Sequence, residues 1–407
     1  MVKSSSLASP PSITVDIGRR ATIPDPVRIA RYMKTPELGP RILFFSGGTA
    51  LKRVSKHLID YTHNSIHIIT AFDSGGSSAA IRDCFQILSI GDLRNRLMAL
   101  ADQSVKGNPG IYRLFSYRLP IEAEQSDLRN KLRHIANGND SLVDGIPISL
   151  RDIICNHLHY FLSLMPNRFD LRGANIGNLI LAGGYINNHN NIETALYLFS
   201  RLAEVRGIVK PVTTASLHLA AELANGAILI GQHVITGNGH ATIRSAIKKI
   251  FLSESRETAM PVKISISREI ASLIAGAELI CYPMGSFYTS VLANFLPERV
   301  GVAVAANHCP KVYVPNTLTD PEQRDMNLMN TVEAIIQYLQ RGTEGKTPRD
   351  FMNFVIVDSV RGRYPFALNL ERIEEMGINI IDTQLITQDS FPYIDPACLN
   401  NILLSLI

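Results

Sequence analysis

The sequence predicts an α/β fold built on a mostly parallel β-sheet, and the order of its first elements carries that prediction. Arg41–Ser46 (RILFFS) and Ile66–Thr70 (IHIIT) are short apolar runs of the kind that form buried strands. Each run ends in a glycine-bearing turn, and a helical period of apolar residues follows, most clearly over Ala50–Tyr61. A strand–helix–strand–helix order is connected by right-handed crossovers, which make the two strands parallel.

Later apolar runs predict the remaining strands: part of Val212–Leu219, Ala227–Ile235, Ala277–Tyr282, Gly301–Ala306, Lys311–Pro315 and Phe354–Asp358. Over about residues 102–170 amphipathic helical stretches replace the strand pattern and predict a helical insert beside the sheet. Residues 1–40, rich in Ser, Pro and basic residues, predict a partly ordered extension with a short helix near Val27–Lys34. Residues 41–407 then form one large domain that contains the insert.

Composition narrows the class of protein. The 407 residues are 46% hydrophobic and 19% charged, which is typical of a soluble globular chain, and the net charge is only +4. We therefore expect no nucleic-acid partner, because such a partner needs a dense basic face. No apolar run is long enough to cross a membrane. The five cysteines are scattered and the amino end has no apolar leader, so we expect reduced thiols in a cytoplasmic protein.

Four loops share one design, in which an apolar segment runs through Gly with Ser, Thr or Asn into a helix. Each loop alone is a weak signal, because glycine turns are common between strands and helices. In a parallel sheet, however, all strand-to-helix turns lie on one edge, so the loops can converge on one crevice. The loops are Ser46–Ala50 (SGGTA), Asp73–Ser78 (DSGGSS), Gly173–Asn178 (GANIGN) and Met284–Ser290 (MGSFYTS).

The second loop points to a phosphate-bearing ligand. Free N–H groups at a helix N-terminus can bind an anion, and Asp73 lies beside that position. An acid next to a phosphate indicates a bridging divalent cation, for which Mg²⁺ is the natural choice. The Rossmann GxGxxG and Walker GxxxxGK(S/T) motifs are both absent from the sequence, which disfavours the usual NAD site and a P-loop kinase.

Several further polar residues are candidate ligand contacts, each with a structural alternative. In Gly91–Asn95 (GDLRN), Asp92 and Arg94 open a helix: Arg94 pairs a phosphate or lies in a surface ion pair, and Asn95 binds a hydroxyl or a base edge. Tyr288 stacks on a nucleobase or packs on its own helix. Asn307 and Asn316 follow predicted strands and read a base or form turns. Arg324 lies in a polar loop that is usually solvated surface.

Taken together, the motifs resemble the CofD/YvcK family over residues 41–394. The matching blocks are SGGTA, FDSGGSSAAIRDCFQILSIGDLRNRLMALAD, NIGNLILAG, MGSFYTSVLANFLPERVGVAVA and KVYVPNTLTD. The resemblance implies a Rossmann-like three-layer αβα fold. It also implies one of two functions: a Mg²⁺-dependent transferase that moves a phospholactyl group from a guanylated donor to the deazaflavin Fo, or a non-catalytic, nucleotide-sugar-binding regulator of carbon metabolism or cell-wall growth. We predict the transferase first and keep the regulator as the alternative.

The resemblance also assigns roles by position, with guanosine or uridine diphosphate compounds as ligands. Asp73 is the metal ligand and, with Arg94, the catalytic pair. The nucleotide- and phosphate-binding residues that it implies are Gly47, Gly48, Thr49, Gly75, Gly76, Ser77, Ser78, Asn175, Asn178, Gly285, Ser286, Tyr288, Thr289 and Ser290. The candidates that the residues themselves add to this set are Asp92, Asn95, Asn307, Asn316 and Arg324. The oligomeric state is left open, with a homodimer as one option.

This chain departs from the family pattern in three places. Phe72-Asp73-Ser74 keeps one acid where family members often have two, Ala174 replaces a histidine, and the first loop reads GGTA rather than GGTG. These differences leave room for a different acceptor, or none.

Overall fold

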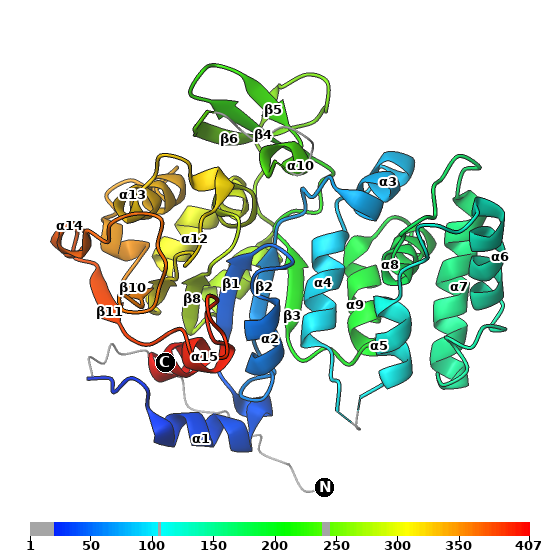
Figure 1. Ribbon diagram of the computed structural model, residues 1–407, viewed down its shortest axis with the longest axis horizontal. Coiled ribbons are helices and arrows are strands. Elements are labelled where there is room, and N and C mark those ends of the chain that lie inside the picture. The colour runs from blue at the N-terminus through cyan, green and yellow to red at the C-terminus, as the bar shows by residue number, and fades with distance from the viewer. Residues whose placement is uncertain (1–19, 105–106, 238–244) are drawn as a thin grey trace, which may run out of the picture.

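The computed structural model describes residues 20–104, 107–237 and 245–407, and its centre is a seven-stranded sheet (Figure 1). The strand order is β11-β10-β9-β8-β1-β2-β3, and every neighbouring pair is parallel. The predicted α/β class is therefore confirmed. The strands are β1 (Ile42–Ser46), β2 (Ile66–Ile69), β3 (Ile208–Pro211), β8 (Leu279–Tyr282), β9 (Lys311–Tyr313), β10 (Phe354–Val357) and β11 (Asn379–Asp382).

Helices cover both faces of the sheet, because successive strand residues point to opposite sides. Ile42 and Phe44 pack in the core beneath helices α2 (Lys52–Leu58) and α15 (Pro396–Ser405). Leu43 and Phe45 belong to the core of the other face, which holds α11 (Arg268–Ala275), α12 (Val300–Ala306), α13 (Leu328–Leu339) and α14 (Leu370–Glu375). All four side chains are fully buried, which stabilises the layers by roughly 1.5–3 kcal/mol each.

The helical insert lies beyond strand β3 and has a core of its own (Figure 1). Helices cover the predicted range 102–170, as expected, and the unit extends further to residue 202. Its helices are α4 (Gly91–Leu100), α5 (Pro109–Ser116), α6 (Gln125–Ala136), α7 (Ile148–Leu164), α8 (Ile176–Asn187) and α9 (Ile192–Leu202), with α3 (Gly76–Phe85) beside them.

A small antiparallel sheet lies above the main sheet and was not predicted (Figure 1). Its order is β5-β4-β6-β7, and it carries helix α10. Its elements are β4 (His218–Leu223), β5 (Ile228–Ile230), α10 (Gln232–Ile235), β6 (Ile247–Ser253) and β7 (Pro261–Val262). The strand expected over Ala227–Ile235 is confirmed for Ile228–Ile230, which form β5, and wrong beyond it, because Gly231 takes a positive φ of 105° and the chain continues into α10.

The predicted strand Gly301–Ala306 is also wrong, since these residues form most of helix α12. A short apolar run cannot be assigned to strand or helix from periodicity alone. In the structure Val300, Gly301, Val304 and Ala305 are buried, which is helical spacing.

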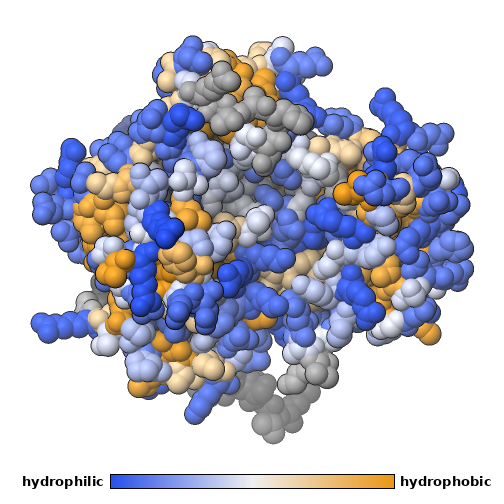
Figure 2. All heavy atoms as spheres, viewed as in Figure 1, coloured by the Kyte–Doolittle hydropathy of each residue, from blue (hydrophilic) through white to orange (hydrophobic). Residues whose placement is uncertain are grey.

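The described part of the amino-terminal extension contains helix α1 (Pro26–Lys34), which confirms the short helix expected there. Asp25 caps α1, and Arg28 donates to the Ser405 carbonyl at 3.1 Å, which attaches the helix to α15. Within the described residues no helix has both the length and the apolar character to cross a membrane. Figure 2 shows a face in which hydrophilic residues predominate and apolar residues gather in separate patches.

Candidate functional site

The strand order reverses between β1 and β8, because the chain runs from β1 towards β3 on one side and from β8 towards β11 on the other. Ligands of open parallel sheets bind outside the carboxyl ends of the strands at such a switch point. Gly47 follows β1 and Ser290 follows β8. A Cβ atom on Gly47 would lie 2.5 Å from the Ser290 hydroxyl, so the first and fourth loops are in direct contact.

The second loop joins the same crevice through the start of α4. A Cβ atom on Gly48 would lie 2.8 Å from the Cα of Asp92, and one on Gly91 would lie 3.3 Å from Oδ2 of Asp73. The backbone N–H of Gly48 also donates to Asp92. The expected convergence is therefore confirmed for these loops.

Two partly buried carboxylates face each other in this crevice. Burial, and then the charge of Asp73, raises the pKa of Asp92 to about 7. Burial also raises the pKa of Asp73, although the Gly75 N–H donates to its Oδ1 at 3.0 Å. Two like charges disfavour their mutual ionisation, and a bound cation relieves that cost.

Asp73 and Asp92 fit a cation that takes some of its ligands from the protein and the others from a bound substrate and water. Among the described residues no group of three or more His, Cys, Asp or Glu side chains could hold a metal ion. Mg²⁺ commonly binds one or two carboxylates and takes its other ligands from substrate phosphates and water. Asp73 and Asp92 supply such a pair.

The N-terminus of helix α3 provides an anion site beside the acids. Its N-cap is Gly75, which has no side chain to cap the first turn. Uncapped N–H groups and the helix dipole favour negative charge at this end. Gly76 has a positive φ of 52° and Ser78 is buried, whereas the side chain of Ser77 lies outside what the structure describes.

Three arginines lie near the acids, Arg94 and Arg96 near Asp92 and Arg82 near Asp73, and only Arg94 was predicted. Arg94 is buried and donates from Nε to Oδ1 of Asn178 at 3.1 Å; burial, and then the charge of Arg118, lowers its pKa to about 10. Arg118 is exposed on the helical insert. Arg96 is fully buried and donates to the Gly47 carbonyl at 2.8 Å, which braces the first loop. The sequence showed Arg96 only as part of a helical pattern.

The expected phosphate cradle in the fourth loop, Gly285–Ser290, is wrong for four of its backbone amides. The N–H of Phe287 donates to Asp320 at 2.8 Å, and those of Tyr288 and Thr289 donate to Glu322 at 2.8 and 2.9 Å. The N–H of Gly285 donates to Oδ1 of Asn316 at 2.8 Å. The chain's own side chains thus occupy the place of an anion, and Ser286 and Ser290 are left as half-buried side chains of this loop.

Three other predicted contacts have structural roles. Tyr288 is buried and donates its hydroxyl to the Ile247 carbonyl at 3.1 Å, so it packs on the protein and does not stack on a base. Asn175 is fully buried and caps α8, accepting from the Asn178 N–H at 3.1 Å. Asn307 donates to the Ile274 and Ala277 carbonyls at 2.7 and 2.9 Å, just before β8, so it lies at the opposite edge of the sheet. That last error follows from mistaking α12 for a strand.

For the remaining candidates, the structure gives a position, and contact with a ligand stays a prediction. Asn316 lies at the crevice, where it fixes Gly285 through its amide. Thr49 and Arg324 are exposed, and Asn95 is half-buried on α4.

A cavity of about 450 Å³ opens beside the first and fourth loops, at the switch point. This volume suits a small ligand. No motif pointed to Arg53 or Tyr393, which reach the cavity from α2 and from the segment before α15. The lining includes Ala50, Arg53, Met284, Asn316, Thr319 and Tyr393.

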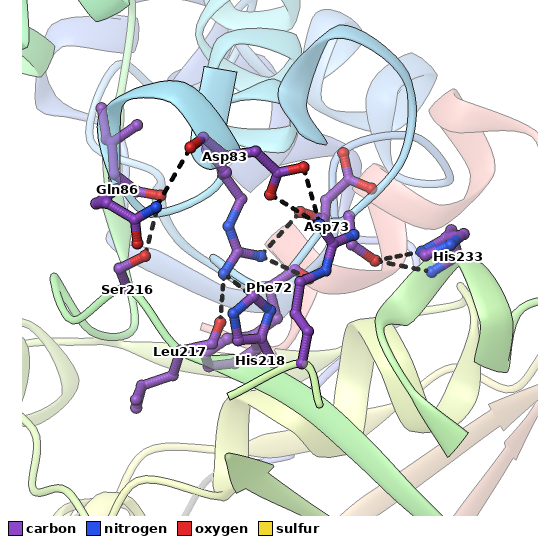
Figure 3. A network of polar contacts seen from close by, with 12 residues as sticks. Phe72, Asp73, Asp83, Gln86, Ser216, Leu217, His218 and His233 are labelled. Carbon is purple, nitrogen blue, oxygen red and sulfur yellow. Dashed lines mark hydrogen bonds and ion pairs between the residues drawn. The ribbon is translucent and has the colours of Figure 1, made fainter. Parts of the chain in front are cut away.

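The small sheet is fastened to the Asp73 loop (Figure 3). Ser74 Oγ lies 2.7 Å from Nδ1 of His233, and the His233 N–H donates to the same oxygen at 3.2 Å. Arg82 donates to the Asp73 carbonyl at 3.1 Å and to the Leu217 carbonyl at 2.8 Å. Ser74 and His233 are 159 positions apart, so no local pattern could predict their contact.

Comparisons with known proteins agree with the motifs. A family model described as 2-phospho-L-lactate transferase CofD matches residues 42–386. The gluconeogenesis factor of Bacillus subtilis (strain 168) is 28% identical over 361 residues, covering 86% of this chain and 92% of that protein. The gluconeogenesis factor of Listeria monocytogenes is 28% identical over 289 residues, covering 71% and 70%.

Among solved structures, a member of the UPF0052 family from Bacillus halodurans superimposes with a TM-score of 0.65 at 22% identity. The match covers 90% of this chain and 99% of that chain. It supports the three-layer fold.

Proposed function

Because the chain belongs to the CofD family, we propose that it binds a nucleoside diphosphate compound with Mg²⁺ and transfers a phospho-linked group from it. The observation that carries this proposal is the facing pair Asp73 and Asp92 beside the uncapped N-terminus of α3. Asp73 and Asp92 would together hold a cation there, and the cation would offset their charge and that of a pyrophosphate.

In this proposal the pyrophosphate lies between the first loop and α3, and the nucleoside extends into the cavity lined by Met284 and Tyr393. Mg²⁺ would neutralise the pyrophosphate charge. Arg94 and the α3 amides stabilise the charge that develops as the phosphorus–oxygen bond to the nucleoside monophosphate breaks. An acceptor hydroxyl forms the new bond to phosphorus, and its proton passes to Asp73 or Asp92.

A second candidate function is non-catalytic regulation through the same crevice. It is supported by the names of the curated relatives, which are gluconeogenesis factors at 26–28% identity over most of this chain. In this case the nucleotide compound binds without turnover, and the bound state is passed on through the helical insert or the small sheet.

One experiment separates the two. The protein is incubated with a guanylated 2-phospholactate donor, Fo and Mg²⁺, and the adduct and GMP are quantified, with Asp73→Asn and the surface variant Asp152→Asn in parallel. Adduct that is lost only in Asp73→Asn supports transfer. Saturable binding of a UDP-sugar in calorimetry, with no adduct and no GMP, supports the regulator and excludes the transferase.

A further inference from the structure

A second cavity of about 620 Å³ lies between the small antiparallel sheet and the helices of the main domain. It shares no lining residue with the switch-point crevice. Strands β6 and β7 form one wall, and the start of α12 and the end of α13 form the other. Its size falls within the range of small-molecule sites.

Most of the lining is apolar, and part of it is open to solvent. Phe251, Leu252 and Val262 come from the small sheet, and Phe295 and Val302 face them from the main domain. Val302 is 41% exposed at the first turn of α12. Such a surface favours a ligand with an apolar body.

Four charged side chains belong to the same lining, and three of them are cationic: Lys263, Arg299 and Arg341. The fourth is Glu298, whose carboxylate lies 3.7 Å from the Lys263 ammonium. The charges of Glu298 and Lys263 therefore balance each other. In residues 20–104, 107–237 and 245–407 neither Arg299 nor Arg341 has a carboxylate within ion-pair distance. Two guanidinium charges therefore remain for a ligand.

Arg341 is held in a defined position. Its guanidinium lies over the Tyr338 ring, 3.7 Å from the ring centroid. The Tyr338 hydroxyl in turn accepts from the Ile250 N–H at 2.9 Å, which fixes the ring against the small sheet. A guanidinium whose face is stacked keeps its N–H edge for a planar oxyanion.

Arg299 has a conformation that a non-glycine residue rarely adopts, with φ of 73°, immediately before α12. Residues in such strained conformations cluster at ligand sites, where the surrounding structure holds them. Here the backbone turn brings this guanidinium to the wall that also carries Val302.

We propose that this cavity binds a small organic anion: a planar or aliphatic apolar body with one carboxylate or phosphate group. The body packs between Val262 and Val302, and the anionic group pairs with Arg299 and Arg341. Because the cavity joins the small sheet to the main domain, an occupant would bridge the same two units that the Ser74–His233 contact connects. This site stands independently of the nucleotide site.

The test uses three probes with one body: 1-naphthoate, 1-naphthyl phosphate and the neutral 1-naphthylmethanol. Each is titrated by calorimetry into the full chain and into the double variant Arg299→Gln/Arg341→Gln. The matched control is Arg113→Gln/Arg268→Gln, which removes two exposed arginines elsewhere. We expect at least one anion to bind with a stoichiometry of one, more tightly than the alcohol.

We further expect the site variant to bind that anion at least tenfold more weakly than the parent chain does. The affinity of the control variant should stay within twofold of the parent value. The ratio of the two anion affinities identifies the preferred head group. An alcohol that binds as tightly as both anions, anion binding that the site variant leaves unchanged, or no saturable binding of any probe would overturn the proposal.

A second variant protects the test against misfolding. Val302→Asp places a carboxylate in the cavity and is compared with Val360→Asp, at a position that is 88% exposed and outside it. Both are expected to melt within a few degrees of the parent chain. Only Val302→Asp should lose anion binding, and equal binding by both variants would contradict the proposed location.

Discussion

The carboxylate of Asp73 acts directly on that of Asp92, and with burial it raises the pKa of Asp92 to about 7. The two acids come from different turns, one after β2 and one at the start of α4. A pair of buried like charges costs folding stability, and under the proposed function a cation bound there would reduce that cost.

Replacing Asp92 should therefore stabilise the free protein. In the unfolded chain an aspartate ionises near pH 4, whereas folded Asp92 keeps its proton to about pH 7. Between these values the folded state binds more protons, so the free energy of unfolding falls as the pH rises. We expect Asp92→Asn to melt several degrees above the parent chain at pH 8 and the difference to shrink towards pH 5, by calorimetric melting. Asp152→Asn, on the exposed face of α7, should match the parent at both pH values.

His218 should produce the opposite dependence. Burial, and then the charges of Arg82 and Arg256, lowers the pKa of His218 to about 4. Between about pH 4 and pH 6.5 the unfolded state binds more protons, so stability rises with pH in this window. The melting temperature of His218→Gln should therefore fall less between pH 7 and pH 5 than that of the parent chain. The exposed His159→Gln is the control, and an unchanged loss in His218→Gln would contradict this assignment.

Glu322 should be required for the fourth loop. It is almost fully buried and accepts from the N–H groups of Tyr288 and Thr289 and from the Thr289 hydroxyl at 2.6 Å. Glu322→Ala leaves three buried donors without their acceptor, which should lower the free energy of unfolding by about 2–4 kcal/mol. Chemical denaturation measures this loss. Glu375→Ala, on the exposed end of α14, should change stability by less than about 0.5 kcal/mol.

Gly48 should tolerate no side chain. A Cβ atom there would lie 2.8 Å from the Cα of Asp92, which is backbone and cannot rotate away. Gly48→Ala should therefore separate the first loop from α4, lower the melting temperature and weaken nucleotide binding. At Gly145 an added Cβ meets nothing within 4 Å and the backbone is not in the positive-φ region, so Gly145→Ala should melt like the parent chain. Equal melting of the two variants would show that the close approach at Gly48 does not exist.

Much of the main sheet could be predicted because its strands are short apolar runs at glycine turns, as in Ile42–Ser46 and Ile66–Ile69. The meeting of Gly47 and Ser290 also followed from the rule that parallel strands end at one edge, whereas the approach of Asp92 from the start of α4 did not. The helix over Val300–Ala306 could not be recognised, since its apolar run has no clear period, and Asn307 was misplaced with it.

Other parts of the site depend on contacts between distant segments. Glu322 and Asp320 saturate the amides of the fourth loop from more than 30 positions away, so the loop resembles an anion cradle in sequence but is already filled. The contact between Ser74 and His233 is of the same kind, since the two residues are 159 positions apart. Tyr393 lines the cavity without belonging to any motif, so no pattern in the sequence assigns it to the site.

The most direct test of the central claim measures bound Mn²⁺, as a substitute for Mg²⁺, by electron paramagnetic resonance during titration with GDP and with a UDP-sugar. The account predicts weak Mn²⁺ binding by the protein alone, and one tightly bound ion per chain once a nucleotide that fits the crevice is present. Asp73→Asn should lower the affinity for that ion at least tenfold, and Asp152→Asn should leave the affinity unchanged. Tight Mn²⁺–nucleotide binding that survives Asp73→Asn, or no nucleotide-dependent binding at all, would contradict the claim that Asp73 and Asp92 hold a cation and its pyrophosphate at this switch point.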